Sequence, residues 1–339
     1  MDQQHKKPIL IWLYAGALLI FTMVIVGGIT RLTHSGLSMV EWKLIMGTIP
    51  PLSEADWQDT FAKYQAFPEY EQINSEFTLE DFKGIFWWEY LHRMIGRLLG
   101  LVFIFPFLFF LWKKWLDPTL KKQLLLMFFL GGFQGFLGWF MVASGLVDNP
   151  SVSHYRLAAH LITATILLGY IFWVIFGLHE KEESPALPKK IGSVAKLLLG
   201  LVLLQIVYGA FVAGLKAGFV FNTFPKMGDS WFPIAITTLE PLWKNFTEGL
   251  AGVQFIHRYL AFAVVGVVGW LWALCSRQEL GTAQKQGLWL IIGMVLIQFS
   301  LGVSTLLLGV PILIAVLHQA GAMLLLISVV HFLNGLRQS

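Results

Sequence analysis

Charged residues and cysteine are scarce in this sequence. Only 13% of its 339 residues are charged, and 56% are hydrophobic. Soluble domains carry roughly 25% charged residues, so this composition excludes a water-soluble fold and indicates a chain whose solvent is lipid. The single cysteine, Cys275, excludes an internal disulfide and a cysteine-ligated cluster. The formal net charge of +4 is small and forms no basic stripe, so we expect no nucleic-acid partner.

Long apolar runs dominate instead. A membrane-spanning helix needs about 20 mostly apolar residues, and eight segments meet that requirement: 8–28, 86–112, 123–143, 156–178, 194–215, 250–274, 287–308 and 311–333. Open sheet edges cannot face lipid, so these spans must be helices. The predicted fold class is therefore an all-α integral membrane protein with eight transmembrane helices. No small-residue cleavage site precedes the first run, so we expect a retained span rather than a signal peptide.

Basic residues gather in alternate loops, which predicts the orientation. They are Lys6, Lys7, Lys113, Lys114, Lys121, Lys122, Lys181, Lys189, Lys190, Lys196, Arg277, Lys285 and Arg337. By the positive-inside rule this side faces the cytoplasm, together with both termini. The opposite side carries an acid-rich first loop, about 29–85, and a second long loop, 216–249. We therefore expect a multi-pass protein of the bacterial inner membrane, because no Arg-rich and Ser-rich transit segment precedes the first span.

The chain also repeats itself. Gln134, Leu137, Gly138 and Gly145 recur at one constant offset as Gln298, Leu301, Gly302 and Gly309. The segment EYLHR (89–93) recurs as QFIHR (254–258), and AAHLITA around His160 recurs as VLHQAGA around His318. These matches predict two pseudo-symmetric four-helix bundles, residues 1–180 and 190–339. Because each half has an even number of helices, the repeat is parallel and its axis lies along the membrane normal.

Four of the nine histidines lie at matched depth in even-numbered spans. These are His92, His160, His257 and His318, each about five to seven residues inside the predicted outer end of its helix. At 1.5 Å per residue that depth is roughly 8–10 Å, toward the periplasmic side. A single intramembrane histidine is equally well explained by a hydrogen bond within the bundle. Four at one depth, related by the repeat, indicate function, because ionisable groups in lipid are unfavourable.

Two histidines per half are compatible with a small metal ion or with a heme. Zinc or copper usually takes a third or fourth protein ligand, and the two halves share no such residue. A heme needs only two axial nitrogens. A small residue follows each histidine four positions later: Gly96, Ala164, Ala261 and Ala322. Small residues leave room for a flat macrocycle, although they also serve helix packing. The pattern favours heme, with the four histidines as axial ligands of iron.

The two halves differ beside the histidines. Glu89 lies three residues before His92 and shares its helix face, whereas the counterpart before His257 is the neutral Gln254. A carboxyl in an apolar pocket is a candidate proton donor or acceptor; the alternative is a structural ion pair with Arg93. The asymmetry predicts chemistry in the first half and a redox heme in the second. The arginines predicted to bind heme propionates by bidentate pairing are Arg31, Arg93, Arg97 and Arg258.

Five motifs resemble the heme A synthase family, in the branch shared by proteobacteria and mitochondria. They are GGITRLTHSGLSMVEW (27–42), WEYLHRMIGRLLG (88–100), SHYRLAAHL (153–161), FNTFPKM (221–227) and QFIHR (254–258). The resemblance implies oxidation of the C8 methyl of heme O to a formyl group by successive hydroxylations, giving heme A for cytochrome oxidase. It also implies that His257 and His318 hold heme b, that His92 and His160 flank the substrate heme O, and that Glu89 is essential.

The resemblance allows heme O synthase as a partner and leaves the electron donor and a homo-oligomer open. Two other functions fit the residues alone. A di-heme electron-transfer cytochrome b would have symmetric pockets, with hemes stacked across the membrane. A heme transporter or chaperone would need an exchangeable heme and no redox chemistry.

Overall fold

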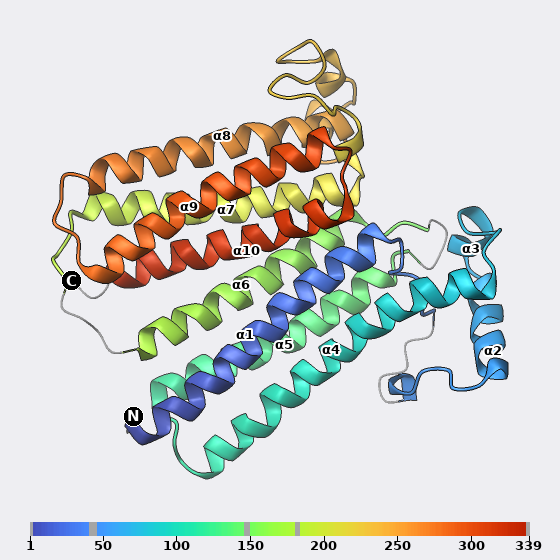
Figure 1. Ribbon diagram of the computed structural model, residues 1–339, viewed down its shortest axis with the longest axis horizontal. Helices are drawn as coiled ribbons and strands as arrows, with labels where there is room; N and C mark the ends of the chain where they lie inside the picture. Colours follow the sequence, from blue (N-terminus) through green and yellow to red (C-terminus); the bar gives the residue numbers. More distant parts are fainter. Residues whose placement is uncertain (1–2, 41–45, 146–149, 180–183, 337–339) are drawn as a thin grey trace. The chain divides into compact units, whose positions relative to one another are not determined.

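The computed structural model describes residues 3–40, 46–145, 150–179 and 184–336. Trp42, which ends the first motif, and the basic residues Lys181 and Arg337 lie outside this range. The described residues form helices and loops, and the pairing of Met227 with Ser230 is an isolated β-bridge. Eight of the described helices are long and apolar enough to cross a membrane (Figure 1). The predicted all-α, multi-pass membrane fold is confirmed.

The eight long helices match the predicted spans to within a few residues at most ends. They are α1 (Gln3–Leu32), α4 (Leu79–Trp112), α5 (Pro118–Val142), α6 (His154–Leu178), α7 (Lys189–Gly214), α8 (Leu250–Cys275), α9 (Thr282–Leu307) and α10 (Ile312–Gly335). The loops contain shorter helices: η1 (Met46–Thr48), α2 (Glu54–Gln65), α3 (Pro68–Gln72), η2 (Ala217–Phe219), η3 (Ile234–Thr237) and η4 (Leu242–Phe246).

Polar caps set the start of α4 beyond the apolar run. Thr78 and Asp81 form a capping box, in which each side chain accepts a hydrogen bond from the other residue's backbone N–H. The helix therefore begins seven residues before the predicted span and runs for 34 residues, long enough to extend beyond the lipid. Asp117 caps α5 by accepting a hydrogen bond from the Leu120 backbone N–H, with Pro118 in the first turn.

The described residues divide by contact into two compact units. The N-terminal unit is Leu18–His160, and the C-terminal unit consists of the described residues of Met1–Ala17 and Leu161–Ser339. In the C-terminal unit, α7 packs on α8 and α10, and α9 packs on α8 and α10, so these four helices form a bundle (Figure 1). The division into sequence halves at residues 180–190 stays a prediction.

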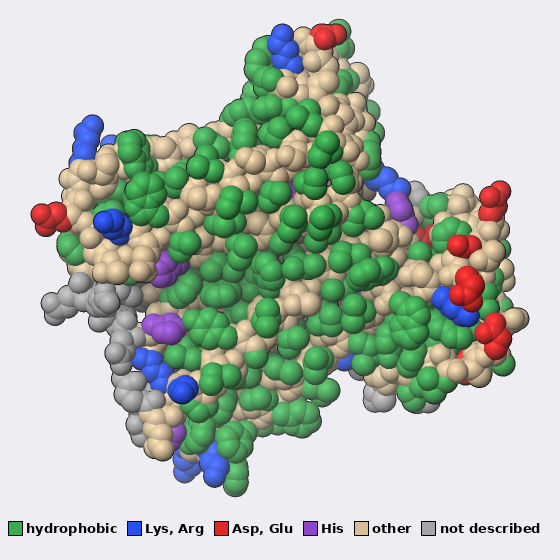
Figure 2. Space-filling view, viewed as in Figure 1, with side chains coloured by type: hydrophobic (Ala, Val, Ile, Leu, Met, Phe, Trp, Pro, Cys, Tyr) green, Lys and Arg blue, Asp and Glu red, His purple; other side chains and the backbone are tan. Residues whose placement is uncertain are grey.

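Large apolar side chains cover the outer faces of the long helices (Figure 2). Phe105 is 66% exposed and Phe129 is 69% exposed, values that water would penalise strongly and lipid does not. Acidic side chains gather instead over α2 and α3 in the first loop, at the right of Figure 2. This separation agrees with the apolar spans and acid-rich loop expected from the sequence.

The first long loop is folded around its own aromatic cluster. Trp57, Tyr64, Phe82, Ile85 and Phe86 are buried together, and Met39 and Val40 pack against them. Since Phe82, Ile85 and Phe86 belong to α4, the cluster fastens α2 and the chain after α1 onto the first turns of that helix. The helix turn that follows this cluster carries Glu89.

A buried polar group lies within this loop. The Tyr64 hydroxyl donates to Glu69 Oε2 at 3.2 Å and accepts from Asn74 Nδ2 at 2.8 Å. Burial raises the pKa of Glu69 to about 7, and the hydrogen bond from Tyr64 offsets only part of that rise. Glu69 therefore takes up a proton in the folded loop at a pH where the unfolded chain has released it.

We predict that the first loop loses stability as pH rises from about 4.5 to 7. Above that range its free energy of unfolding should no longer change with the protonation of Glu69. The folded pKa exceeds the unfolded one, so between these two pH values the folded state keeps a proton that the unfolded chain has released, and stability falls as pH rises. The full difference corresponds to about 3 kcal/mol. Hydrogen exchange of residues 54–77, corrected for its intrinsic pH dependence, measures it. Glu69→Gln should remove the dependence, and the matched change at exposed Glu71 should leave it intact. The same slope in both variants would contradict the assignment.

Candidate functional site

The four predicted histidines lie in two pairs, one in each unit. His92 on α4 and His160 on α6 belong to the N-terminal unit and lie near enough to interact electrostatically. His257 on α8 and His318 on α10 belong to the C-terminal unit, where their ring centres are 6.4 Å apart with the planes at 85°. The structure therefore brings together the histidines that the repeat assigns to one half.

Each histidine ring lies against a glycine of the helix that precedes it. A Cβ atom at Gly27, Gly138 or Gly209 would lie 3.1, 3.1 or 3.3 Å from Cε1 of His92, His160 or His257. At Gly302 the corresponding distance to His318 is 2.8 Å, which no side chain tolerates without a shift. The glycines let the two helix backbones approach and fix the imidazole between them.

A glutamine accompanies three of these four contacts. Gln134, Gln205 and Gln298 each lie four residues before the glycine, on the same helix face. Their Nε2 atoms donate to the backbone oxygens of His160, His257 and His318 at 2.9, 2.9 and 2.8 Å. The equivalent residue on α1, four before Gly27, is Met23. The repeat in the sequence relates Gln134 to Gln298 but assigns neither a role, and the matched residues do not include Gln205 and Gly209.

The geometry of the second pair fits a heme with two axial histidines. A metal–imidazole bond is about 2.0–2.1 Å and the ring centre lies roughly 1 Å behind the bonded nitrogen, so two axial rings have centres roughly 6 Å apart. The observed 6.4 Å agrees. Within the described chain, no group of three or more His, Cys, Asp or Glu side chains is placed to hold a bare metal ion. A heme fits such a donor set, because the porphyrin supplies the remaining four donors.

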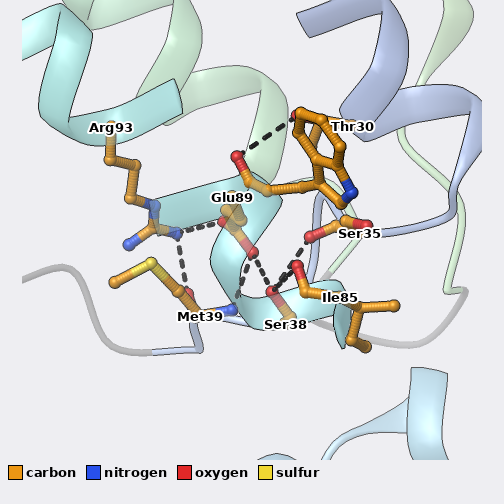
Figure 3. A network of polar contacts seen from close by, with 8 residues as sticks. Thr30, Ser35, Ser38, Met39, Ile85, Glu89 and Arg93 are labelled. Atoms are coloured by element: carbon orange, nitrogen blue, oxygen red, sulfur yellow. Dashed lines mark hydrogen bonds and ion pairs between the residues drawn. The ribbon is translucent and has the colours of Figure 1, made fainter. Parts of the chain in front are cut away.

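Glu89 forms the centre of a buried polar network in the N-terminal unit (Figure 3). Its Oε1 accepts from Arg93 Nη2 at 2.6 Å. Its Oε2 accepts from the Ser38 hydroxyl at 2.8 Å and from the Met39 backbone N–H at 2.7 Å. Arg93 also donates to the Met39 carbonyl at 2.7 Å. The ion pair considered as an alternative is thus present, and Glu89 is the acceptor that ties α4 to the chain after α1.

At the matching position, the C-terminal unit holds its loop with a hydrogen-bond donor where the N-terminal unit has an acceptor. Gln254 Nε2 donates to the Phe221 carbonyl at 3.1 Å. Arg258 donates to the carbonyls of Phe221 and Thr223 at 2.6 and 2.7 Å, and to that of Lys226 at 3.2 Å. Where Glu89 accepts hydrogen bonds, Gln254 gives one. The predicted difference between the halves is therefore a difference in the electrostatics of the site.

The four arginines predicted to bind propionates have different surroundings. The guanidinium groups of Arg93 and Arg258 hold loop carbonyls, and Arg97 Nη1 contacts Met94 Sδ at 3.7 Å. Arg31 lies in the last turn of α1. Propionate binding by these residues stays a prediction. Arg93 and Arg258 also hold the loops in place through their hydrogen bonds to backbone carbonyls.

Comparison with known proteins places this chain in a family. A family model described as cytochrome oxidase assembly protein matches residues 10–330. A heme A synthase of Flavobacterium psychrophilum is 47% identical over 98% of both chains. Heme A synthases of Nitrosomonas eutropha and Arabidopsis thaliana are each 45% identical over 95% of this chain, covering 92% and 73% of their own lengths. Since the match spans all eight transmembrane helices, the chain belongs to the cytochrome oxidase assembly protein family.

Proposed function

We propose that this protein is a heme A synthase, an oxidoreductase that converts the C8 methyl of heme O to a formyl group by successive hydroxylations. One observation carries the proposal: both histidine pairs rest on the same glycine contacts, yet among the described residues only the first has a buried carboxylate, Glu89, on the face of its histidine. Relatives that are about 45% identical over nearly all of the chain are named heme A synthase.

The second pair is suited to a resident heme b. Its rings are fixed by Gly209 and Gly302, and the backbones of His257 and His318 are held by glutamine amides. A bound heme supplies one-electron redox chemistry at this place. Gln254 replaces the carboxylate of the first pair, so no carboxylate at that position balances the positive charge of Arg258.

The first pair is suited to the substrate, with His92 and His160 on its two faces. Each hydroxylation of the methyl group requires protons to move, inward where molecular oxygen is activated and outward where water supplies the oxygen. Glu89 is the group that carries them, at Oε2, with the Ser38 hydroxyl 2.8 Å away as the next proton carrier. Arg93 keeps the carboxylate in position and balances its charge.

A di-heme electron-transfer cytochrome is the second candidate. It accounts for the paired histidines but predicts equal pockets, and Glu89 and Gln254 are chemically unequal. The function of a heme transporter accounts neither for the buried carboxylate of Glu89 nor for a second histidine pair suited to a redox heme. An electron donor, heme O synthase and a second copy of the chain remain open as partners of the synthase.

The orientation in the inner membrane is proposed from the charge distribution, with both termini in the cytoplasm and both heme sites toward the periplasm. A cysteine at exposed Asp59 should react with a membrane-impermeant maleimide added to whole spheroplasts, whereas one at exposed Lys189 should react only after the membrane is opened. The native Cys275 is 1% exposed and gives little background. Labelling of Lys189→Cys in intact spheroplasts, with Asp59→Cys protected, would reverse the topology.

His257→Ala and His318→Ala should each abolish stable heme b binding, because either change removes one of two axial nitrogens. The purified variants should lose the low-spin spectrum and most extractable heme b. His331→Ala is the matched control: this histidine lies on α10 against Phe176, away from the pair, and its loss should leave heme b content unchanged. A full low-spin spectrum in either ligand variant would remove that histidine from the site.

Glu89→Gln should lower heme A formation by about 10²-fold or more, the usual contribution of a positioned acid or base. Gln has the same size but cannot take up a proton, and it offers one acceptor oxygen where Ser38, Met39 and Arg93 all donate. The ratio of heme O, hydroxylated heme and heme A extracted at matched protein level measures the effect.

Two controls separate proton transfer from loop fastening. Gln254→Glu should leave heme A formation nearly intact and create no second reactive pocket. In Glu89→Gln, heme b content and resistance of the first loop to proteolysis should stay near wild type. Loss of heme b or of loop protection would assign Glu89 to the structural ion pair, and near-normal heme A would exclude the proton role.

A further inference from the structure

Two of the three glutamines that hold histidine backbones also lie beside the imidazole rings. Gln134 Nε2 is 3.1 Å from Nδ1 of His160, and Gln205 Nε2 is 3.5 Å from Nε2 of His257. The amide oxygens of Gln134, Gln205 and Gln298 are buried and have no hydrogen-bond partner among the described residues. Each of these sites therefore has a fixed amide with an unused acceptor oxygen.

The ring nitrogens have the complementary need. Nδ1 of His257 and of His318 is buried and without a partner in the described part of the chain. When one nitrogen of an imidazole binds a metal, the other carries a hydrogen and usually donates it to a nearby acceptor, which orients the ring and raises its basicity. Gln205 and Gln298, which hold the backbones of these two histidines, each have an unused amide oxygen of that kind.

The first contact of the N-terminal unit lacks this acceptor. Nδ1 of His92 is also buried without a partner among the described residues, but the residue in the glutamine position is Met23. Its methyl group lies 3.5 Å from where a Cβ of Gly96 would be, one turn along α4 from His92. A thioether is only a weak acceptor, so His92 lacks the amide that holds the histidine backbone in the other three contacts.

We propose that this difference separates the exchangeable heme from the resident one. Gln205 and Gln298 hold both ligands of the resident heme, whereas the substrate heme has one held ligand, His160, and one weakly held ligand, His92. A substrate must enter and its product must leave, and Met23 provides for that by leaving His92 without an amide. Met23 and the three glutamines are thus positioning residues, an assignment that rests on the proposed function.

The test exchanges the two residue types between the sites. Purified wild type, Met23→Gln and Gln205→Met are loaded with heme O and heme b, and each heme is followed as it transfers to excess apomyoglobin. Extraction and chromatography distinguish the two hemes. Met23→Gln should slow the departure of heme O about tenfold, and Gln205→Met should speed the departure of heme b about tenfold, the lower range for loss of such a partner. In each variant the other heme should depart at the wild-type rate.

Two further measurements separate the amide from simple packing. Met23→Leu keeps an apolar side chain of similar size and should release heme O like wild type. Gln205→Met should also raise the midpoint potential of heme b, because a histidine without its acceptor is less basic and stabilises ferric iron less. A purely structural glutamine would leave the potential of the remaining bound heme unchanged.

The outcomes are decisive in both directions. Unchanged departure of heme O from folded Met23→Gln, or equal slowing by Met23→Leu, overturns the proposal for Met23. If Met23→Gln does not fold, Gln205→Met alone tests the proposal. An unchanged departure rate and an unchanged midpoint potential of heme b in that variant overturn it. Wild-type protein that binds neither heme O nor heme b would contradict the proposed function instead, whereas binding of both with equal release in all variants contradicts only this inference.

Discussion

The contact between a histidine ring and a glycine of the neighbouring helix is the constraint on which the site depends. It recurs four times, with Gly27, Gly138, Gly209 and Gly302. In lipid no hydrophobic force drives helices together, so close backbone approach and hydrogen bonds must do so. A glycine permits that approach, and the imidazole then fills the gap in one orientation. The same contact therefore packs the helices and aims the candidate ligands.

Polar fastening of the loops follows from the position of these contacts near helix ends. Arg93 and Arg258 come one residue after a candidate ligand and donate to carbonyls of the chain that follows the preceding long helix. Each arginine thus couples the depth of its histidine to the loop that covers the pair. A change in either loop would shift a guanidinium group next to a candidate ligand.

The hydropathy of the chain and the positions of its ionisable residues allowed the spans and the four histidines to be predicted, because lipid imposes those features locally. The glycine and glutamine roles were not predicted, since they depend on which face of one helix meets the next. Gln134 and Gly138 were visible as repeats of Gln298 and Gly302, but a repeat alone assigns no contact. Met23 is an ordinary apolar residue in an apolar span and becomes informative only beside its three counterparts. The anchoring of Glu89 to Met39 depends on loop folding, which sequence periodicity does not specify.

The difference between the loop contacts of the two units indicates why the N-terminal unit has a carboxylate, Glu89. In the C-terminal unit, Gln254 and Arg258 fasten the loop through four donor contacts to backbone carbonyls, without any negative charge. Fastening alone therefore does not require an acid at this position. In the N-terminal unit the acid needs Arg93, Ser38 and the Met39 N–H to support it in a buried place, and burial of an unsupported charge is strongly unfavourable. A group that requires three partners, where a neutral one serves the related loop, is better explained by proton chemistry beside His92 than by structure alone.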